Sequence, residues 1–149
     1  MTTKSDSNLQ TNVKQAVPFF MVKNMGKSLD FYINGLGFQL MNKWEPNGKI
    51  EWCWLQLEHV SIMLQEYTQS PPNDKSGVGI SVYFICEDAI SIYEEINLRG
   101  FQPADPFVGN AMWVVGLKDP DGYYIYFESP TEVQEGTVYS EWLKMKKTE

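Results

Sequence analysis

An internal repeat constrains the fold of this chain more than any other feature of its 149 residues. Four residues recur at a constant spacing of 63 positions, so that Asn34, Gly37, Phe38 and Gln39 match Asn97, Gly100, Phe101 and Gln102. Apolar residues at helical spacing precede the match in both segments. Two copies of one structural unit therefore imply gene duplication and pseudo-twofold symmetry.

Each copy is predicted to fold as a strand, a helix and three further strands. In the first copy the strands are expected at 17–22, 38–44, 50–57 and 60–66. In the second they are expected at 78–86, 101–108, 112–117 and after residue 122, the second of these being broken by Pro103 and Pro106. Asn24 and Asp88 are the predicted helix N-caps. One unit alone would leave a sheet face bare, so the two faces must close on each other, or on a second chain, around a shared cleft.

A tight turn with the sequence Asp119-Pro120-Asp121-Gly122 precedes the last strand. Asp119 suits the first position of a type I turn, Pro120 the second and Gly122 the fourth, so this segment is predicted to be a hairpin tip. Alternation along the following strand places Tyr124, Tyr126 and Glu128 on one face and Tyr123, Ile125 and Phe127 on the other.

These patterns predict one α+β domain over residues 16–130, made of the modules 16–67 and 78–130. Residues 1–15 have no hydrophobic period and are expected to form a mobile arm, and 68–77 form a polar, proline-rich linker. The tail, 131–149, is expected to carry a short docked helix ending in lysines.

Composition narrows the possible partners. The formal net charge of -7, without any compensating run of Lys or Arg, argues against nucleic acid. No apolar run approaches the length of a membrane span and the N-terminus has no apolar signal region, so we expect a cytoplasmic protein with no membrane partner. Cys53 and Cys86 lack metal-like spacing and are expected to be buried, reduced thiols.

The turn at 119–122 and the segment 16–38, in this order and at this separation, resemble the vicinal oxygen chelate superfamily, which includes glyoxalase I, extradiol dioxygenases, and fosfomycin- and bleomycin-resistance proteins. The resemblance is strongest to metal-free bleomycin-resistance proteins, which share the Ala16-Val17-Pro18 opening. It implies two tandem βαβββ modules that form a cleft between curved mixed sheets, and it implies a homodimer.

The resemblance also implies four metal-ligand positions, at Val17, Leu64, Ser81 and Tyr126. None of these is a His or a carboxylate, so we expect no metal and no cofactor. The only histidine, His59, falls at a predicted hairpin turn and is expected to be solvated. Two alternatives remain for Glu66 and Glu128: they enter the cleft together if the strand register is shifted by two residues, or they are strand-end carboxylates near solvent.

Aromatic residues dominate the predicted binding surface. The candidate ligand-binding residues are Phe19, Trp52, Trp54, Leu64, Ser81, Tyr83, Trp113, Tyr124 and Tyr126. Alternation must send some of them to the core. The leading hypothesis is a metal-free protein that binds an aromatic or cationic small molecule. The alternatives are a lyase, isomerase or dioxygenase-like enzyme using Glu66 and Glu128 as metal ligand or general base, or an interaction module.

Overall fold

The computed structural model describes residues 12–71 and 77–148, so parts of the predicted arm (1–11) and linker (72–76) lie outside the described residues. The first module contains β1 (Phe19–Val22), α2 (Met25–Leu29), the π-helix η2 (Asp30–Gly35), β2 (Gln39–Trp44), β3 (Trp52–Leu57) and β4 (Val60–Glu66). The second contains β5 (Ser81–Ile85), α3 (Ala89–Leu98), β6 (Phe107–Gly109), β7 (Met112–Lys118) and β8 (Tyr124–Pro130), and α4 (Tyr139–Lys147) follows it.

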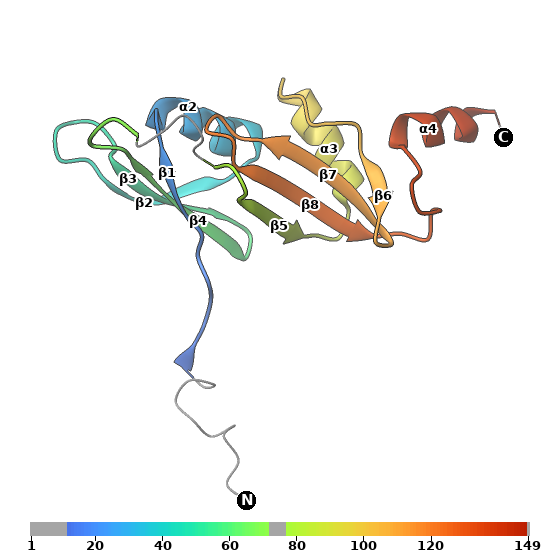
Figure 1. Cartoon of the computed structure of the whole chain (residues 1–149), viewed down its shortest axis with the longest axis horizontal. Helices are drawn as coiled ribbons and strands as arrows, with labels where there is room; N and C mark the ends of the chain where they lie inside the picture. Colours follow the sequence, from blue (N-terminus) through green and yellow to red (C-terminus); the bar gives the residue numbers. More distant parts are fainter. Residues whose placement is uncertain (1–11, 72–76, 149) are drawn as a thin grey trace, which may run out of the picture.

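Each module forms one four-stranded mixed sheet, with strand orders β1-β4-β3-β2 and β5-β8-β7-β6. The first and last strands of each module pair in parallel, and the other neighbours pair antiparallel. Helices α2 and α3 lie on the same side of the two sheets (Figure 1). The predicted α+β fold with two βαβββ modules is therefore confirmed.

The two helices begin as predicted but differ in length by one residue. Asn24 accepts a hydrogen bond from the Lys27 amide, and Asp88 accepts one from the Ser91 amide, which satisfies a free N–H at each helix start. Thirteen positions separate Asn24 from Gly37, whereas twelve separate Asp88 from Gly100. The extra residue of the first module is accommodated by the π-helical turn η2. Consequently the modules correspond at a spacing of 64 residues before the helices and 63 after them.

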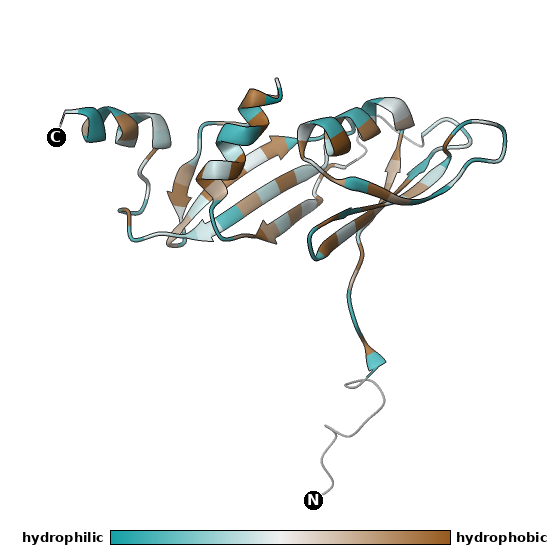
Figure 2. Cartoon of the chain, turned by 180° about the vertical axis from the view of Figure 1, so that it is seen from behind, coloured by the Kyte–Doolittle hydropathy of each residue, from teal (hydrophilic) through white to brown (hydrophobic). Residues whose placement is uncertain are grey.

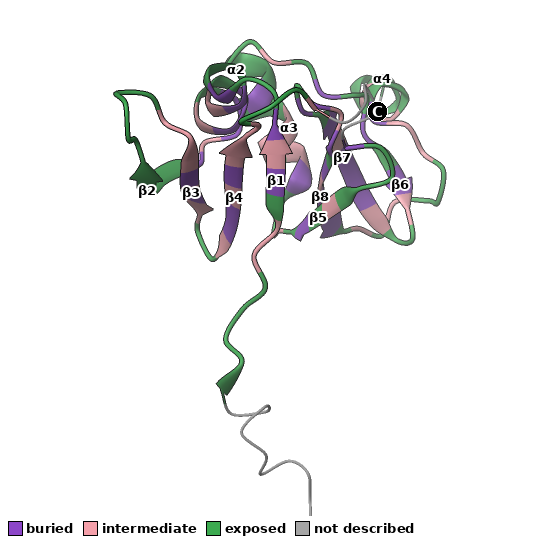
Figure 3. Ribbon diagram, turned by 60° about the vertical axis from the view of Figure 1, so that its left-hand side comes forward, coloured by how far each residue is buried: buried purple, intermediate pink, exposed green. Residues whose placement is uncertain are grey.

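Alternation along the strands separates a core face from an open face. Figure 2 shows alternating apolar and polar bands along the strands of the second sheet, and Figure 3 shows buried bands along β4 and β1. The core-facing side chains come from both modules and form one hydrophobic cluster. The opposite side of each sheet carries no helix, and we call these sides the open faces (Figure 1).

A strand was predicted at 101–108, but the observed strand β6 has only three residues, Phe107–Gly109. Pro103 and Pro106 are both buried, and neither can donate an amide hydrogen bond to a neighbouring strand. The strand predicted at 78–86 is also shorter, Ser81–Ile85. The tail helix α4 is as predicted, and its Trp142 packs edge-on against Trp113.

The turn at 119–122 is not an exposed tip but a joint between the modules. The amide of Gly122 donates to the Asp119 carbonyl at 3.0 Å, as a type I turn requires. Asp119, Asp121 and Tyr123 are nevertheless buried. We use "Asp119 joint" for residues 119–123 together with the first-module residues Phe20, Met21, Lys23 and Tyr32 that they contact.

Hydrogen bonds hold the Asp119 joint together. The Asp119 carboxylate accepts from the Tyr32 hydroxyl at 2.7 Å and from the amides of Asp121 and Tyr123 at 2.8 and 2.9 Å. The Lys23 amide donates to the Asp121 side chain at 2.9 Å. Burial raises the pKa of the Asp119 carboxyl above its ordinary value, although the hydrogen bonds it accepts oppose that rise. The buried carboxylate therefore accepts two hydrogen bonds within its own turn and one, from Tyr32, across the boundary of the two modules.

Candidate functional site

Three tyrosines form a stack on the open face of the second sheet. Tyr83 in β5 lies opposite Tyr126 in β8, and their rings are nearly parallel, with centroids 4.6 Å apart and an interplanar angle of 14°. Tyr124, two residues before Tyr126 on the same face, continues the stack at 6.1 Å and 10°. Tyr83 and Tyr124 are 52% and 38% exposed, so the stack offers aromatic surface to a ligand.

Gly116 in β7 supports the central ring of this stack. It pairs with Tyr126 across the β7–β8 ladder, and a Cβ atom at Gly116 would lie 2.8 Å from Cε1 of that ring. The ring therefore lies directly over the β7 backbone, which only a glycine permits. Gly116 was not among the predicted site residues, although an isolated glycine within a predicted strand often marks such a close approach.

A groove of about 470 Å³ runs beside the stack. It is bordered by Phe107, Val114, Gly116, Tyr124, Tyr126 and neighbouring residues of the 102–105 segment. The Lys118 ammonium lies 5.3 Å from the centroid of the Tyr124 ring, within the range of a cation–π contact. Burial, and then the charges of Tyr83 and Tyr124, raise the pKa of Tyr126, so its phenol remains protonated and can donate a hydrogen bond.

The open face of the first sheet is also aromatic. Phe19 in β1 and Trp54 in β3 both lie opposite Met63 of β4, and Trp52 lies opposite Gln65. Cys53 and Leu55, which alternate with the tryptophans, are fully buried on the core face. Seven of the nine predicted binding residues thus lie on open faces: Phe19, Trp52, Trp54, Ser81, Tyr83, Tyr124 and Tyr126.

Two predicted binding residues lie elsewhere. Leu64 is fully buried in the core, so its predicted place in the cleft is wrong. Trp113 is also buried, packing against Tyr139 and Trp142 beneath α4. Both errors have the same cause, because a shift of one position along a strand moves a side chain to the other face of the sheet.

Glu66 and Glu128 do not occupy equivalent positions in the two modules. Strand pairing joins Phe19 to Met63 and Tyr83 to Tyr126, so Met63 corresponds to Tyr126. Gln65 is therefore the counterpart of Glu128, and Glu66 is the counterpart of Ser129. The alternative in which the two carboxylates enter the cleft together is therefore wrong, because Glu66 and Glu128 lie on opposite faces of their sheets.

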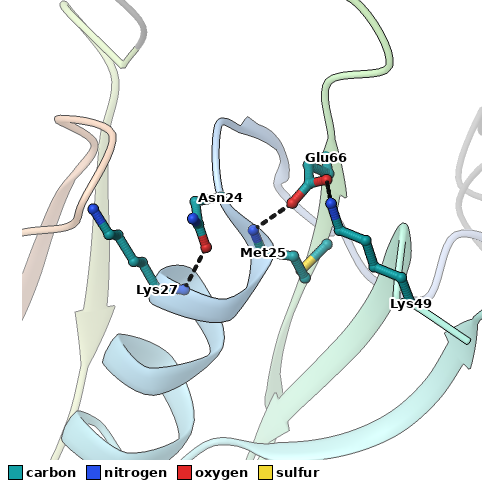
Figure 4. Close-up of polar contacts among 5 residues, drawn as sticks. All are labelled: Asn24, Met25, Lys27, Lys49 and Glu66. Carbon is teal, nitrogen blue, oxygen red and sulfur yellow. Dashed lines mark hydrogen bonds and ion pairs between the residues drawn. The ribbon is translucent and has the colours of Figure 1, made fainter.

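Glu66 instead anchors the start of the first helix (Figure 4). Its carboxylate accepts from the Met25 amide at 2.7 Å and pairs with the Lys49 ammonium at 2.5 Å. Ser129 does the same in the second module, where its hydroxyl accepts from the Ala89 amide at 2.8 Å. Partial burial acts against ionisation of Glu66, but the two hydrogen bonds outweigh it and lower its pKa. A carboxylate with a lowered pKa that is already hydrogen-bonded makes a poor general base.

The residues at the metal-ligand positions do not fit a catalytic metal. With the corrected pairing, Met63 replaces Leu64, and the set becomes Val17, Met63, Ser81 and Tyr126. This set contains neither imidazole nor carboxylate, the ligands that such metals need. Within residues 12–71 and 77–148 no group of three or more His, Cys, Asp or Glu side chains is placed to hold a metal ion. His59 is exposed in the turn between β3 and β4, as predicted.

No helix within the described part of the chain has the length and apolar character needed to cross a membrane.

Comparison with known proteins agrees with this architecture. The chain is similar in structure to a bleomycin resistance determinant encoded on the transposon Tn5, with a TM-score of 0.64, 19% sequence identity, and 81% of this chain and 100% of the other covered. It is similar to TioX from Micromonospora sp. ML1 (TM-score 0.63, 15% identity, 79% and 99% covered). It is also similar to TnmS3, an antibiotic binding protein from Streptomyces sp. CB03234 (TM-score 0.60, 20% identity, 79% and 98% covered).

At these identities the structural similarities establish the fold. No curated protein sequence matches the chain. The family model described as Glyoxalase/Bleomycin resistance protein/Dioxygenase superfamily matches residues 14–127, which is most of the chain. The chain therefore belongs to the glyoxalase/bleomycin resistance protein/dioxygenase superfamily.

Proposed function

We propose that this protein is a metal-free binder of small molecules, and that its ligand is a flat aromatic or cationic compound. The observation that carries the proposal is the stack of Tyr83, Tyr126 and Tyr124, three nearly parallel and partly exposed rings beside a groove of about 470 Å³. A groove with an aromatic wall and few polar groups suits an organic ligand.

The chemistry of the stack favours this class of ligand. A flat ring can lie against an exposed tyrosine, and a cation over a ring face gains about 0.5 to 2 kcal/mol per contact. The net charge of -7 adds a long-range attraction for cations. Two of the similar structures are named for antibiotic binding or bleomycin resistance, which supports an antibiotic-like compound as the ligand.

We further propose that the protein acts as a homodimer with twofold symmetry. Large apolar side chains remain exposed on and beside the open faces, including Phe19 at 47%, Trp44 at 56% and Ile85 at 64%. Surfaces of this kind mark association sites. A second copy would cover the open faces, and the first-sheet residues Trp52 and Trp54 would then complete a cleft with the tyrosine stack.

The alternative, an enzyme that uses Glu66 and Glu128 together, loses support from the geometry. Glu66 is engaged by Met25 and Lys49, and only Glu128 lies on an open face. No second carboxylate or imidazole accompanies Glu128 within the strands that pair with β8.

A thermal-shift screen tests the binding proposal. The flat aromatic cation proflavine and bleomycin should raise the melting temperature, whereas glutathione conjugates and EDTA should leave it unchanged. Replacing Tyr126 with Ala should reduce the shift, and replacing the exposed His59 with Ala should not. Stabilisation by glutathione conjugates alone, or stoichiometric zinc, nickel, iron or manganese in protein purified without chelator, would contradict the proposal.

A further inference from the structure

Pseudo-twofold symmetry predicts a second joint between the modules. The Asp119 joint places the β7–β8 turn of the second module against the end of β1 and the helix of the first. Its symmetric counterpart places the β3–β4 turn, Glu58 and His59, beside the end of β5 and helix α3. We call this second contact region the Glu58 joint.

The two joints are filled very differently. Phe84 is the counterpart of Phe20, because each lies four residues before the N-cap of its helix, Asp88 or Asn24. Val60 is the counterpart of Tyr123, because they lie three residues before the equivalent positions Met63 and Tyr126. In the Asp119 joint the rings of Phe20 and Tyr123 stack at 4.0 Å. In the Glu58 joint a valine takes the place of the tyrosine, and the space that a ring would occupy is left open.

The result is a pocket of about 720 Å³ between the modules. Its walls are mainly aliphatic, with two phenylalanines, and include Leu36, Leu57, Val60, Ile92, Ile96, Phe84 and Phe127. It shares no lining residue with the groove beside the tyrosine stack. The pocket is therefore a separate site, large enough for a small organic molecule.

The rim of this pocket is acidic. Three carboxylates border it, those of Glu58, Glu87 and Glu95, against one guanidinium, that of Arg99. Arg99 is already engaged, because it pairs with Glu95 at 3.3 Å and donates to the Asn34 carbonyl at 3.4 Å. Glu58 and Glu87 make no salt bridge with any residue of the described segments. The uncompensated charge at the rim is thus negative.

We propose that the pocket of the Glu58 joint binds a compact organic cation with an aliphatic body, such as a primary amine attached to an alicyclic ring. The ring would take the place that Tyr123 occupies in the Asp119 joint, against Phe84 and Val60. The ammonium group would lie at the rim between Glu58 and Glu87. Such a ligand contacts both modules and so stabilises their association.

Cys86 makes occupancy of the pocket directly measurable. Cys86 is partly exposed and lines the pocket, whereas Cys53 is fully buried, so one of the chain's two cysteines reports on the site. Burial raises the pKa of Cys86, so alkylation should be followed at mildly alkaline pH. The probes are 2-cyclohexylethylamine and its matched carboxylate, 3-cyclohexylpropanoate, with iodoacetamide as the reagent and mass spectrometry as the readout.

The amine should slow alkylation of Cys86 at a concentration about tenfold lower than the carboxylate requires. The reason is that the acidic rim attracts the ammonium group and repels the carboxylate, which should change the affinity by about this factor. Changing Glu58 and Glu87 together to Gln should remove the difference without altering the fold, because both side chains are exposed. Equal protection by amine and carboxylate in the wild type, or a preference for the amine that survives the double change, would overturn the proposal.

Filling the pocket tests its location. Val60→Phe, or Ile92→Phe from the opposite wall, should abolish protection by the amine, with the melting temperature showing that each variant is folded. Tyr126→Ala, which disrupts the tyrosine stack, should leave protection of Cys86 intact. If protection survives in both pocket-filling variants, or is lost in Tyr126→Ala, the amine binds elsewhere and the proposal is wrong.

Discussion

The two joints between the modules occupy symmetric places but differ in character. The Asp119 joint is closed by a buried carboxylate that accepts three hydrogen bonds and by a stack of two rings. The Glu58 joint has a shorter turn, a valine in place of the tyrosine, and a pocket of about 720 Å³. One copy of the contact is thus a structural anchor, while the other contains open space.

The largest effect is expected from removing the Asp119 carboxylate. Asp119→Ala leaves the Tyr32 hydroxyl and the amides of Asp121 and Tyr123 without their partner in a buried place, and should lower the free energy of unfolding by about 3 to 5 kcal/mol. Asp119→Asn retains an acceptor for the two amides and should cost less. Urea denaturation measures both, and equal losses would show that the hydrogen bonds are not what stabilises the joint.

A smaller effect is expected from making the Asp119 joint resemble the Glu58 joint. Tyr123→Val removes the ring that stacks on Phe20 and the hydroxyl that donates to the Met21 carbonyl at 3.0 Å. The free energy of unfolding should fall by about 2 to 4 kcal/mol, as for other large-to-small changes in a core. Leu98→Ala provides a matched control, because Leu98 is 83% exposed. A loss no larger than in the control would mean that the stack does not hold the modules together.

The smallest effect is expected where a side chain of the last strand caps a helix. Glu66→Gln should cost about 1 kcal/mol at neutral pH, because it removes the charge at the Met25 amide and the ion pair with Lys49. Ser129→Ala, the equivalent change in the second module, should cost a similar amount through the Ala89 amide. Chemical denaturation of both variants tests whether Glu66 and Ser129 play equivalent parts in the two modules. Destabilisation by only one of the two changes would show that they do not.

The pH dependence of stability should have opposite signs for the two acidic anchors. The pKa of Glu66 is lowered from 4.5, so its contribution is complete above that value and is lost as pH falls through the folded pKa. The pKa of Asp119 is raised from 3.8, so its contribution is greatest below that value and declines as pH rises through the folded pKa.

Unfolding free energies measured between about pH 3 and 6 test this difference. Relative to wild type, Glu66→Gln should flatten a slope in which stability rises with pH. Asp119→Asn should remove a contribution to stability that declines as pH rises. Slopes changed in the same direction by both variants would contradict the assignments.

Much of the fold followed from local signals in the sequence. Asn24 and Asp88 were recognisable as N-caps, and the strand at Val60–Glu66 could be placed from its apolar run. The strand expected at 101–108 begins only at Phe107, because Pro103 and Pro106 interrupt backbone pairing in the preceding segment. Boundaries depend on such competing preferences, which only tertiary contacts resolve.

The candidate site was harder to predict because it depends on strand register. The repeat showed a constant spacing of 63 residues, but the π-turn η2 changes that spacing to 64 before the helices. The predicted ligand positions Leu64 and Tyr126 are 62 residues apart, one residue off the spacing of 63 that pairs Met63 with Tyr126 after the helices. This offset placed Leu64 in the cleft. Period-two alternation turns such an error of one residue into the wrong face of the sheet. Tyr124 and Tyr126 were placed on a common face because they directly follow the turn, but their stacking with Tyr83 depends on the pairing of β5 with β8, which the sequence alone does not show.

The central claim is that the tyrosine stack binds a flat aromatic cation, and fluorescence titration with proflavine tests it most directly. Wild-type protein should bind proflavine saturably, and Tyr126→Ala should weaken binding about tenfold, equivalent to losing about 1.4 kcal/mol of ring contact. Tyr93→Ala is the matched control, because Tyr93 packs on Tyr139 rather than in the stack, and its affinity should equal that of the wild type. No saturable binding by the wild type, or equal affinities of Tyr126→Ala and the wild type, would contradict the account.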